Sequence, residues 1–186
     1  PLMATVESGS FAAAEWLIQH GADTNVLSLP SNEAITSLWC AAEYGYFRLA
    51  KLLLDAGADV NVAKASTGNT ALYVAVQNGH KAMVMLLLKY GADPNRKINQ
   101  ASDTFEPIVM AIGMQMPALV AQLVNAGARI PYSCMTALAN MRERKTTLNI
   151  NRMEKVTDEE IKVLDELVHV NASLRDDSNY AKARVA

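Results

Sequence analysis

The side chains that could support catalysis are few in this 186-residue chain, and no motif brings them together. The histidines are His20, His80 and His169, and the cysteines are Cys40 and Cys134. A catalytic nucleophile needs a nearby base, and a metal site needs clustered His, Cys or carboxylate ligands. The sequence shows neither pattern, and it contains no glycine-rich phosphate loop. We therefore predict no catalytic residue, no metal ligand and no cofactor in this chain.

One phrase, Gly-Ala-Asp-x-Asn, recurs along the chain. Complete copies begin at Gly21, Gly57 and Gly91, and a degenerate copy begins at Gly127, so the intervals are 36, 34 and 36 residues. A period between about 20 and 50 residues is typical of stacked-repeat proteins. An aspartate present in each complete copy suits a turn better than catalysis. Each repeat is too small to bury its own apolar face, so it must pack on its neighbours.

Each repeat is expected to contain two helices. The first helices begin near Pro1, Thr36, Thr70 and Pro107, where threonine suits an N-cap and proline suits a first turn. Gly9, Gly45 and Gly79 are expected to end them. The more apolar second helices are predicted over residues 11–20, 47–56, 81–90 and 118–126. The fourth repeat has Gln115 in place of the glycine, for which we expect a different turn.

Helix, glycine turn, helix, Gly-Ala-Asp-x-Asn and an extended loop together resemble the ankyrin repeat family. The resemblance covers residues 1–130 with four units, of which the first is truncated at its N-terminus. It implies an all-α solenoid of stacked helix-turn-helix units with projecting hairpin-like loops. The family's Thr-Pro-Leu-His phrase is altered, and its histidine is replaced in successive units by Met3, Trp39, Tyr73 and Val109. We expect apolar and aromatic packing at these positions.

Beyond residue 130 the pattern becomes degenerate. Residues 131–175 are either a fifth unit with an insertion or a separate helical cap, and residues 176–186 form a tail without a core pattern. Pro131 is expected to open a helix that runs to about Arg144. Thr157 and Glu160 form a capping box that predicts the start of another helix. The mildly basic stretch 142–155 also carries acidic residues, which favours a solvated loop over a lipid or RNA contact.

The resemblance implies binding of another protein through the loop tips and the concave face of the first helices. The concave candidates precede each inter-helix turn: Glu7, Ser8, Glu43, Tyr44, Gln77, Asn78 and, less regularly, Gly113 and Met114. A family repeat has about 33 residues, and the units of this chain are longer. The additional residues fall in the loops between units, and loops often carry binding function. Leu27, Leu29 and Phe105 are the exposed apolar candidates there. The alternatives are a solvated helix edge and a neutral lengthening of the loops.

Composition narrows the class of partner. The net charge of −2 argues against a nucleic-acid surface, which usually needs a basic patch. Helix aromatics such as Trp16 and Phe47 are expected to pack in the core rather than to stack on bases. No apolar run approaches the roughly 20 residues that span a bilayer, so membrane insertion is not expected. Two cysteines without a disulfide or metal spacing favour a reducing, intracellular compartment.

Two functions from different classes are consistent with these features. The first is a protein–protein interaction module or scaffold, monomeric and without catalysis in this chain. The second is a targeting or regulatory region of a larger enzyme or secreted effector whose catalytic domain lies outside these residues. The chain begins partway through a repeat, which keeps the second function open. The compartment is cytoplasmic or nuclear under the first, and a host cytosol under the effector alternative.

Overall fold

The computed structural model describes residues 1–28, 34–96, 106–134, 136–138, 140 and 162. Within these residues the chain forms consecutive helix pairs, here called units 1 to 4. The pairs are α1 (Leu2–Glu7) with α2 (Phe11–Gln19), α3 (Ser37–Tyr44) with α4 (Phe47–Asp55), α5 (Ala71–Gln77) with α6 (Lys81–Lys89), and α7 (Pro107–Gly113) with α8 (Pro117–Asn125). A 3₁₀ helix, η2, follows at Tyr132–Cys134.

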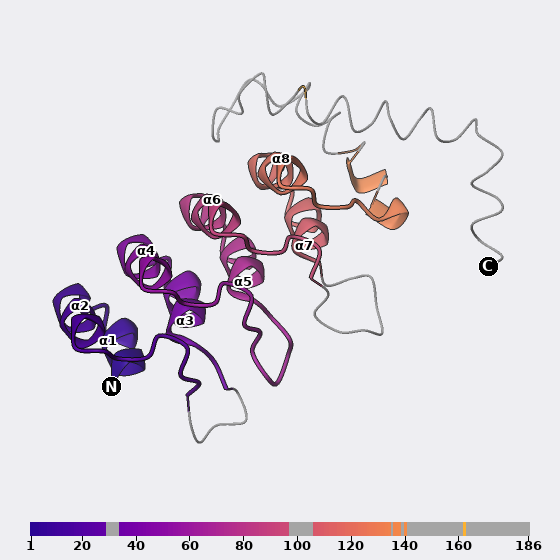
Figure 1. Ribbon diagram of the computed structural model, residues 1–186. Coiled ribbons are helices and arrows are strands. Elements are labelled where there is room, and N and C mark those ends of the chain that lie inside the picture. Colours follow the sequence, from indigo (N-terminus) through magenta and orange to yellow (C-terminus); the bar gives the residue numbers. More distant parts are fainter. Residues whose placement is uncertain (29–33, 97–105, 135, 139, 141–161, 163–186) are drawn as a thin grey trace.

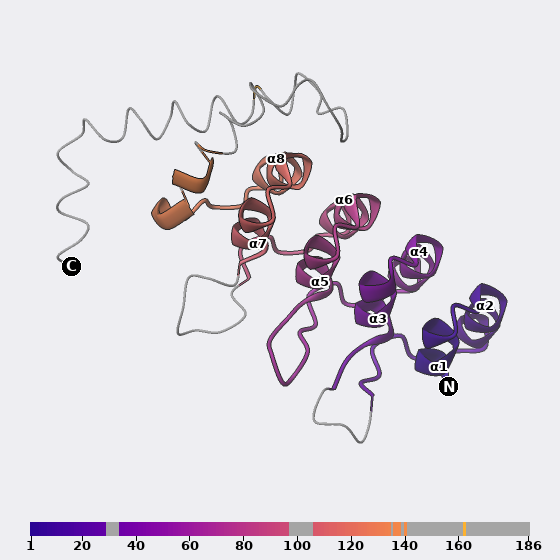
Figure 2. The same ribbon diagram turned by 180° about the vertical axis from the view of Figure 1, so that it is seen from behind.

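The helices lie in two layers (Figures 1 and 2). α1, α3, α5 and α7 form an inner layer, and α2, α4, α6 and α8 form an outer layer. The described parts of the loops between units project from the inner layer, on the side away from the outer helices. Each inner helix packs on the outer helix of its own unit, and the inner helices of consecutive units pack on each other. The predicted all-α stack of helix-turn-helix units is confirmed.

The local sequence explains where the helices begin. Thr36 and Thr70 are the N-caps of α3 and α5, as predicted, and their Oγ1 atoms accept hydrogen bonds from the backbone N–H of Trp39 (3.2 Å) and of Tyr73 (3.3 Å). These bonds satisfy N–H groups that have no partner inside the helix. Pro107 is the first residue of α7, where its missing N–H removes no helical bond.

The turn between the two helices of a unit needs glycine for two reasons. Gly45 has φ = +71°, a left-handed conformation that side chains with a Cβ disfavour. A Cβ on Gly45 would also lie 2.9 Å from the ring of His80, which reaches back from the next unit. Tyr46 covers Gly9 in the same way, so each turn is part of the contact between units.

Unit 4 makes the same turn without glycine. Gln115 occupies the left-handed position with φ = +56°. The N–H of Met116 donates to the carbonyl of Ala111 at 3.0 Å, as the N–H of His80 does to the carbonyl of Ala75 at 2.9 Å. The expectation of a different turn was therefore wrong. The stacking geometry imposes the left-handed conformation on a residue that does not favour it.

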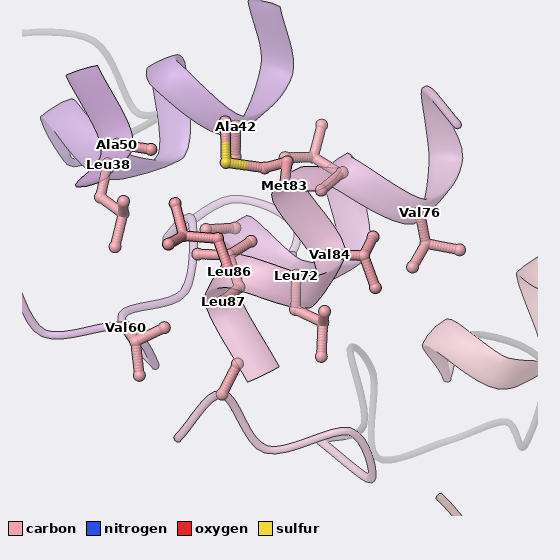
Figure 3. Close-up of a cluster of buried hydrophobic side chains, with 14 of the residues drawn as sticks. Leu38, Ala42, Ala50, Val60, Leu72, Val76, Met83, Val84, Leu86 and Leu87 are labelled. Carbon is pink, nitrogen blue, oxygen red and sulfur yellow. The ribbon is translucent and has the colours of Figure 1, made fainter. Parts of the chain in front are cut away.

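The apolar faces of neighbouring units form one continuous core. Figure 3 shows side chains of unit 2, such as Leu38 and Ala50, in the same cluster as Leu72 and Leu86 of unit 3. Burying a leucine side chain contributes about 1.5–3 kcal/mol. Much of this burial exists only because two units meet, so no unit is stable alone.

An asparagine in each loop joins one unit to the next. Asn61 Nδ2 donates to the carbonyl of Gly91 (3.2 Å), and Asn61 Oδ1 accepts from the N–H of Asp93 (2.9 Å). Asn25 and Asn95 make the same two bonds to the corresponding residues of the following units. We call these three residues the asparagine ladder. It ties consecutive loops together by side-chain bonds to the backbone.

The recurring aspartate accepts a hydrogen bond from the ladder asparagine of its own loop. Asp59 Oδ1 accepts from the N–H of Asn61 at 2.9 Å, and Asp23 and Asp93 do the same in their loops. The aspartates therefore act in turns, as predicted. In the degenerate fourth copy Arg129 replaces aspartate and supplies only its backbone N–H, 2.7 Å from an asparagine Oδ1. The change is tolerated because the ladder asparagine bonds only to the backbone N–H of this residue.

The loop of residues 62–69 shows the expected hairpin form. Ala63 and Thr70 form an isolated antiparallel bridge, and the N–H of Lys64 donates to the carbonyl of Asn69 at 2.8 Å. Lys64 Nζ lies 5.1 Å from the ring centroid of Trp39, which is buried at the family's histidine position. Aromatic packing does replace the histidine in this unit, while Trp39 Nε1 has no hydrogen-bond partner.

After unit 4 the chain continues as η2, where the sequence predicted an α-helix from Pro131 to about Arg144. Residues 136–138 are again α-helical, and Cys134 and Leu138 are buried in the core. These side chains cover the end of the stack, which fits both a fifth unit and a cap. The capping box at Thr157, the basic stretch 142–155 and the tail 176–186 lie outside the described residues.

The ladder predicts an energetic cost for removing one rung. In Asn61→Ala the carbonyl of Gly91 and the N–H of Asp93 lose their partners. We expect the free energy of unfolding to fall by about 1–2 kcal/mol, measured by urea denaturation followed by circular dichroism. Asn69→Ala is the control, because it removes an asparagine from the same loop that is not in the ladder. Equal losses in both variants would contradict the role of the ladder.

The turn of unit 4 predicts a stabilising substitution. Gln115→Gly places at φ = +56° a residue that adopts this conformation without strain, and the free energy of unfolding should rise by about 0.5–1 kcal/mol. The control is Gln77→Gly at the end of α5, where the same change should lower stability because glycine is disfavoured in helices. Thermal unfolding of both variants checks the sign. A lower melting temperature for Gln115→Gly would show that the backbone of Gln115 is not strained at this φ.

Candidate functional site

The predicted concave residues occupy equivalent places in the four units. Ser8, Asn78 and Met114 are the C-caps of α1, α5 and α7, and Tyr44 is the last residue of α3. Each stands immediately before the turn that leads to the outer helix. We call these four, with the residue before each, the inner-helix row. The inner helices of consecutive units pack on each other, so these positions at their C-terminal ends follow one another from unit to unit.

The inner-helix row is open to solvent and changes character along its length. Every residue of the row is exposed except Glu43, which is half-buried. Tyr44 is 52% exposed. Units 1 and 2 contribute the carboxylates of Glu7 and Glu43, unit 3 contributes the amides of Gln77 and Asn78, and unit 4 contributes Gly113 and the thioether of Met114. The row therefore runs from acidic and aromatic, through neutral polar, to apolar.

Unit 3 fixes the position of the second pair in the row. The carbonyl of Glu43 accepts from Asn78 Nδ2 at 2.9 Å, and His80 Nε2 lies 3.2 Å from the same oxygen. Asn78, which the sequence suggested as a contact residue, is thus already used in stacking. These bonds hold the backbone at Glu43, while the side chain of Tyr44 is exposed and that of Glu43 is half-buried.

The loops supply a second set of apolar side chains. Leu27 is exposed, as the sequence predicted, and its neighbour Val26 is exposed as well. The base of this loop is closed where the N–H of Ser28 donates to the carbonyl of Ile35 at 2.9 Å. Val26 was not among the predicted contact residues, although it lies in the same inserted segment. Leu29 and Phe105 lie outside the described residues.

Two aromatic residues expected in the core are on the surface. Phe47 is exposed, and Trp16 is 57% exposed and stacks on His20 with 3.9 Å between ring centroids. The equivalent positions in units 2 and 3 are Leu52, half-buried, and Leu86, buried in the core. The prediction for Trp16 was wrong. Apolar periodicity shows that a helix has an apolar face, but it does not show whether a neighbouring unit packs against that face.

The titratable groups near the inner-helix row are not arranged for catalysis. Burial raises the pKa of the Cys40 thiol to about 12, and the nearby carboxylates of Glu7 and Glu43 add to the increase, so this thiol stays protonated. The imidazoles of His20 and His80 each face a backbone carbonyl rather than a nucleophile. His169 lies outside the described residues. Among the described residues, no three His, Cys, Asp or Glu side chains are grouped to hold a metal ion.

Comparison with known proteins identifies the repeat. The family described as "Ankyrin repeats (3 copies)" matches residues 2–98 and, in an overlapping second match, residues 41–134. The comparison with curated proteins gave no match. Over the described part of the chain, no helix is both long enough and apolar enough to cross a bilayer. The matched segments include units 1 to 4 and the asparagine ladder and extend over most of the sequence, so the chain belongs to the ankyrin repeat family.

Proposed function

We propose that this chain binds a partner protein through the inner-helix row and the adjoining loops. Ankyrin repeats are generally protein–protein interaction modules. The observation that carries the proposal for this chain is the row itself, in which Tyr44 and Met114 stand exposed on a backbone fixed by stacking. No step of catalysis is part of this proposal.

The chemistry of the row supports a protein partner. Large apolar and aromatic side chains provide most of the binding energy in protein interfaces when they become buried. Tyr44 and Met114 lie in different units, so a partner must extend along the row to contact both. Asn78 and His80 already hold the backbone next to Tyr44 before binding, which should lower the entropy lost in the complex.

The first loop extends the same surface. Val26 and Leu27 are adjacent and exposed, and the asparagine ladder fixes the start of their loop through the hydrogen bonds of Asn25 to Gly57 and Asp59. Two neighbouring apolar side chains on a projecting loop are suited to contact a partner that also lies on the inner layer. Leu29 and Phe105 belong to the same proposal, as loop contacts on the first and third loops.

The proposal also concerns compartment and the class of partner. Cys40 and Cys134 are free and buried, which supports a reducing cytoplasm or nucleus. The net charge of −2 and the carboxylates of the row favour a protein over a nucleic acid. We propose that the chain is monomeric when unbound.

Substitution of the exposed apolar residues tests the proposal. The chain is immobilised, and proteins captured from lysate are compared between the original sequence and the variants Tyr44→Ala, Met114→Ala and Leu27→Ala. Affinity for each purified captured protein is then measured by calorimetry. Loss of an aromatic or apolar anchor should weaken binding about tenfold or more.

Met85→Ala provides the matched control. Met85 is 59% exposed on the outer helix α6, away from the inner-helix row. The Met85→Ala substitution removes a similar apolar area without changing the proposed interface, so binding of the partner should be retained. If every captured protein bound the three test variants as tightly as the original, the interface would not lie on the inner-helix row and the first loop.

A further inference from the structure

Units 1 and 2 bring two tyrosines and two glutamates together at one end of the inner-helix row. We call Glu7, Glu43, Tyr44 and Tyr46 the tyrosine–glutamate patch. Three of these residues belong to unit 2 or to its turn, and Glu7 is the last residue of α1. The patch exists only because units 1 and 2 are stacked.

The two aromatic rings have different roles in the patch. The ring of Tyr46 lies against Gly9, with its Cζ 3.3 Å from the point where a Cβ would stand, so it is held between the two units. The ring of Tyr44 is mostly exposed and lies 5.5 Å from the ring of Tyr46, with 34° between the ring planes. The fixed ring therefore supports an exposed ring, whose faces carry negative electrostatic potential.

Neither carboxylate of the patch is part of an ion pair in the described part of the chain. Neither Glu7 nor Glu43 forms an ion pair with a described lysine or arginine, whereas Lys51 pairs with Asp55 on the outer helix α4. Coulomb repulsion by Glu43, together with a smaller contribution from Glu7, raises the pKa of the Tyr44 hydroxyl. Both carboxylates therefore add negative charge near the Tyr44 hydroxyl.

The backbone under the patch is held before any ligand arrives. The carbonyl of Glu43 is bonded to Asn78 Nδ2, and His80 lies against both this carbonyl and Gly45. These contacts use main-chain atoms of residues 43 and 45, and no described residue bonds to the carboxylate of Glu43, which is half-buried. A rigid arrangement of aromatic rings and unpaired carboxylates favours a cation, because little order must be created on binding.

We propose that the tyrosine–glutamate patch binds an arginine side chain of the partner protein. A guanidinium group is planar, stacks on aromatic rings and donates several hydrogen bonds to carboxylates in a fixed geometry. Tyr44 provides the stacking surface, and Glu7 and Glu43 provide the acceptors. Anionic lipid and nucleic acid are excluded by the charge of the patch. This inference rests on the proposed function and specifies which residue of the partner meets units 1 and 2.

Titration of the isotope-labelled chain with short peptides tests the inference by NMR. The probes are acetylated and amidated Gly-Arg-Gly and the same peptide with citrulline, which has the shape of arginine without its charge. With arginine we expect saturable shifts of the amide resonances of residues 7 and 43–46. The citrulline peptide should bind about tenfold more weakly, as expected for loss of a cation–π contact and of charge pairing at an exposed site.

Two matched pairs of variants locate the effect. Glu43→Gln should weaken binding of the arginine peptide roughly threefold to fivefold, while Glu15→Gln, an equal change of charge on the outer helix α2, should not. Tyr44→Phe keeps the ring and should retain most of the binding, whereas Tyr44→Ala should lose it. Equal affinities for the arginine and citrulline peptides, or equal effects of Glu43→Gln and Glu15→Gln, would overturn the inference.

The result is distinguishable from the test of the proposed function. If the arginine peptide does not bind, but Tyr44→Ala or Met114→Ala still lowers the affinity for a captured protein, only the proposed arginine site is wrong. Should the arginine peptide bind the patch while those variants leave every captured partner unaffected, the patch binds arginine but the proposed interface is wrong.

Discussion

Each helix pair in this chain buries its apolar faces only by packing against the next pair. The apolar core provides the free energy for this stacking, and the asparagine ladder sets the register, because each asparagine bonds to the backbone of the following loop at both its amide and its carbonyl. Leucine packing alone would tolerate some sliding between units, whereas two short hydrogen bonds to fixed backbone atoms do not. The remaining features of the fold follow from this contact.

The candidate binding surface is a consequence of the same stacking. The inner-helix row lies where the first helices end, at turns that are themselves covered by residues of the next unit, such as His80 on Gly45. Side chains of the row therefore stand on a backbone that two units hold. Its change from carboxylates and tyrosines to amides and a methionine gives a rigid surface with different chemistry at its two ends. A partner that matches both ends must lie across several units.

The sequence predicted the fold closely, because repetition makes each pattern visible several times. The helix bounds differ from the predicted ones by one residue in most outer helices, and the Thr36 and Thr70 caps are where they were expected. The errors arose where context overrides local preference. Gln115 adopts a left-handed turn because stacking requires it, and Trp16 is exposed although its equivalents Leu52 and Leu86 are half-buried and buried. The row was located, but the clustering of Tyr44 and Tyr46 with Glu7 depends on contacts between units that spacing does not encode.

Hydrogen exchange at the loop amides tests the central role of stacking most directly. The N–H groups of Asp59, Asp93 and Arg129 lie in exposed loops, yet each donates to a ladder asparagine at 2.7–2.9 Å. If the ladder holds the units in register, these amides should exchange as slowly as helix amides such as that of Leu53, since both open only when units separate. Exchange as fast as that of Ser66, an exposed residue at a loop tip, would contradict this account.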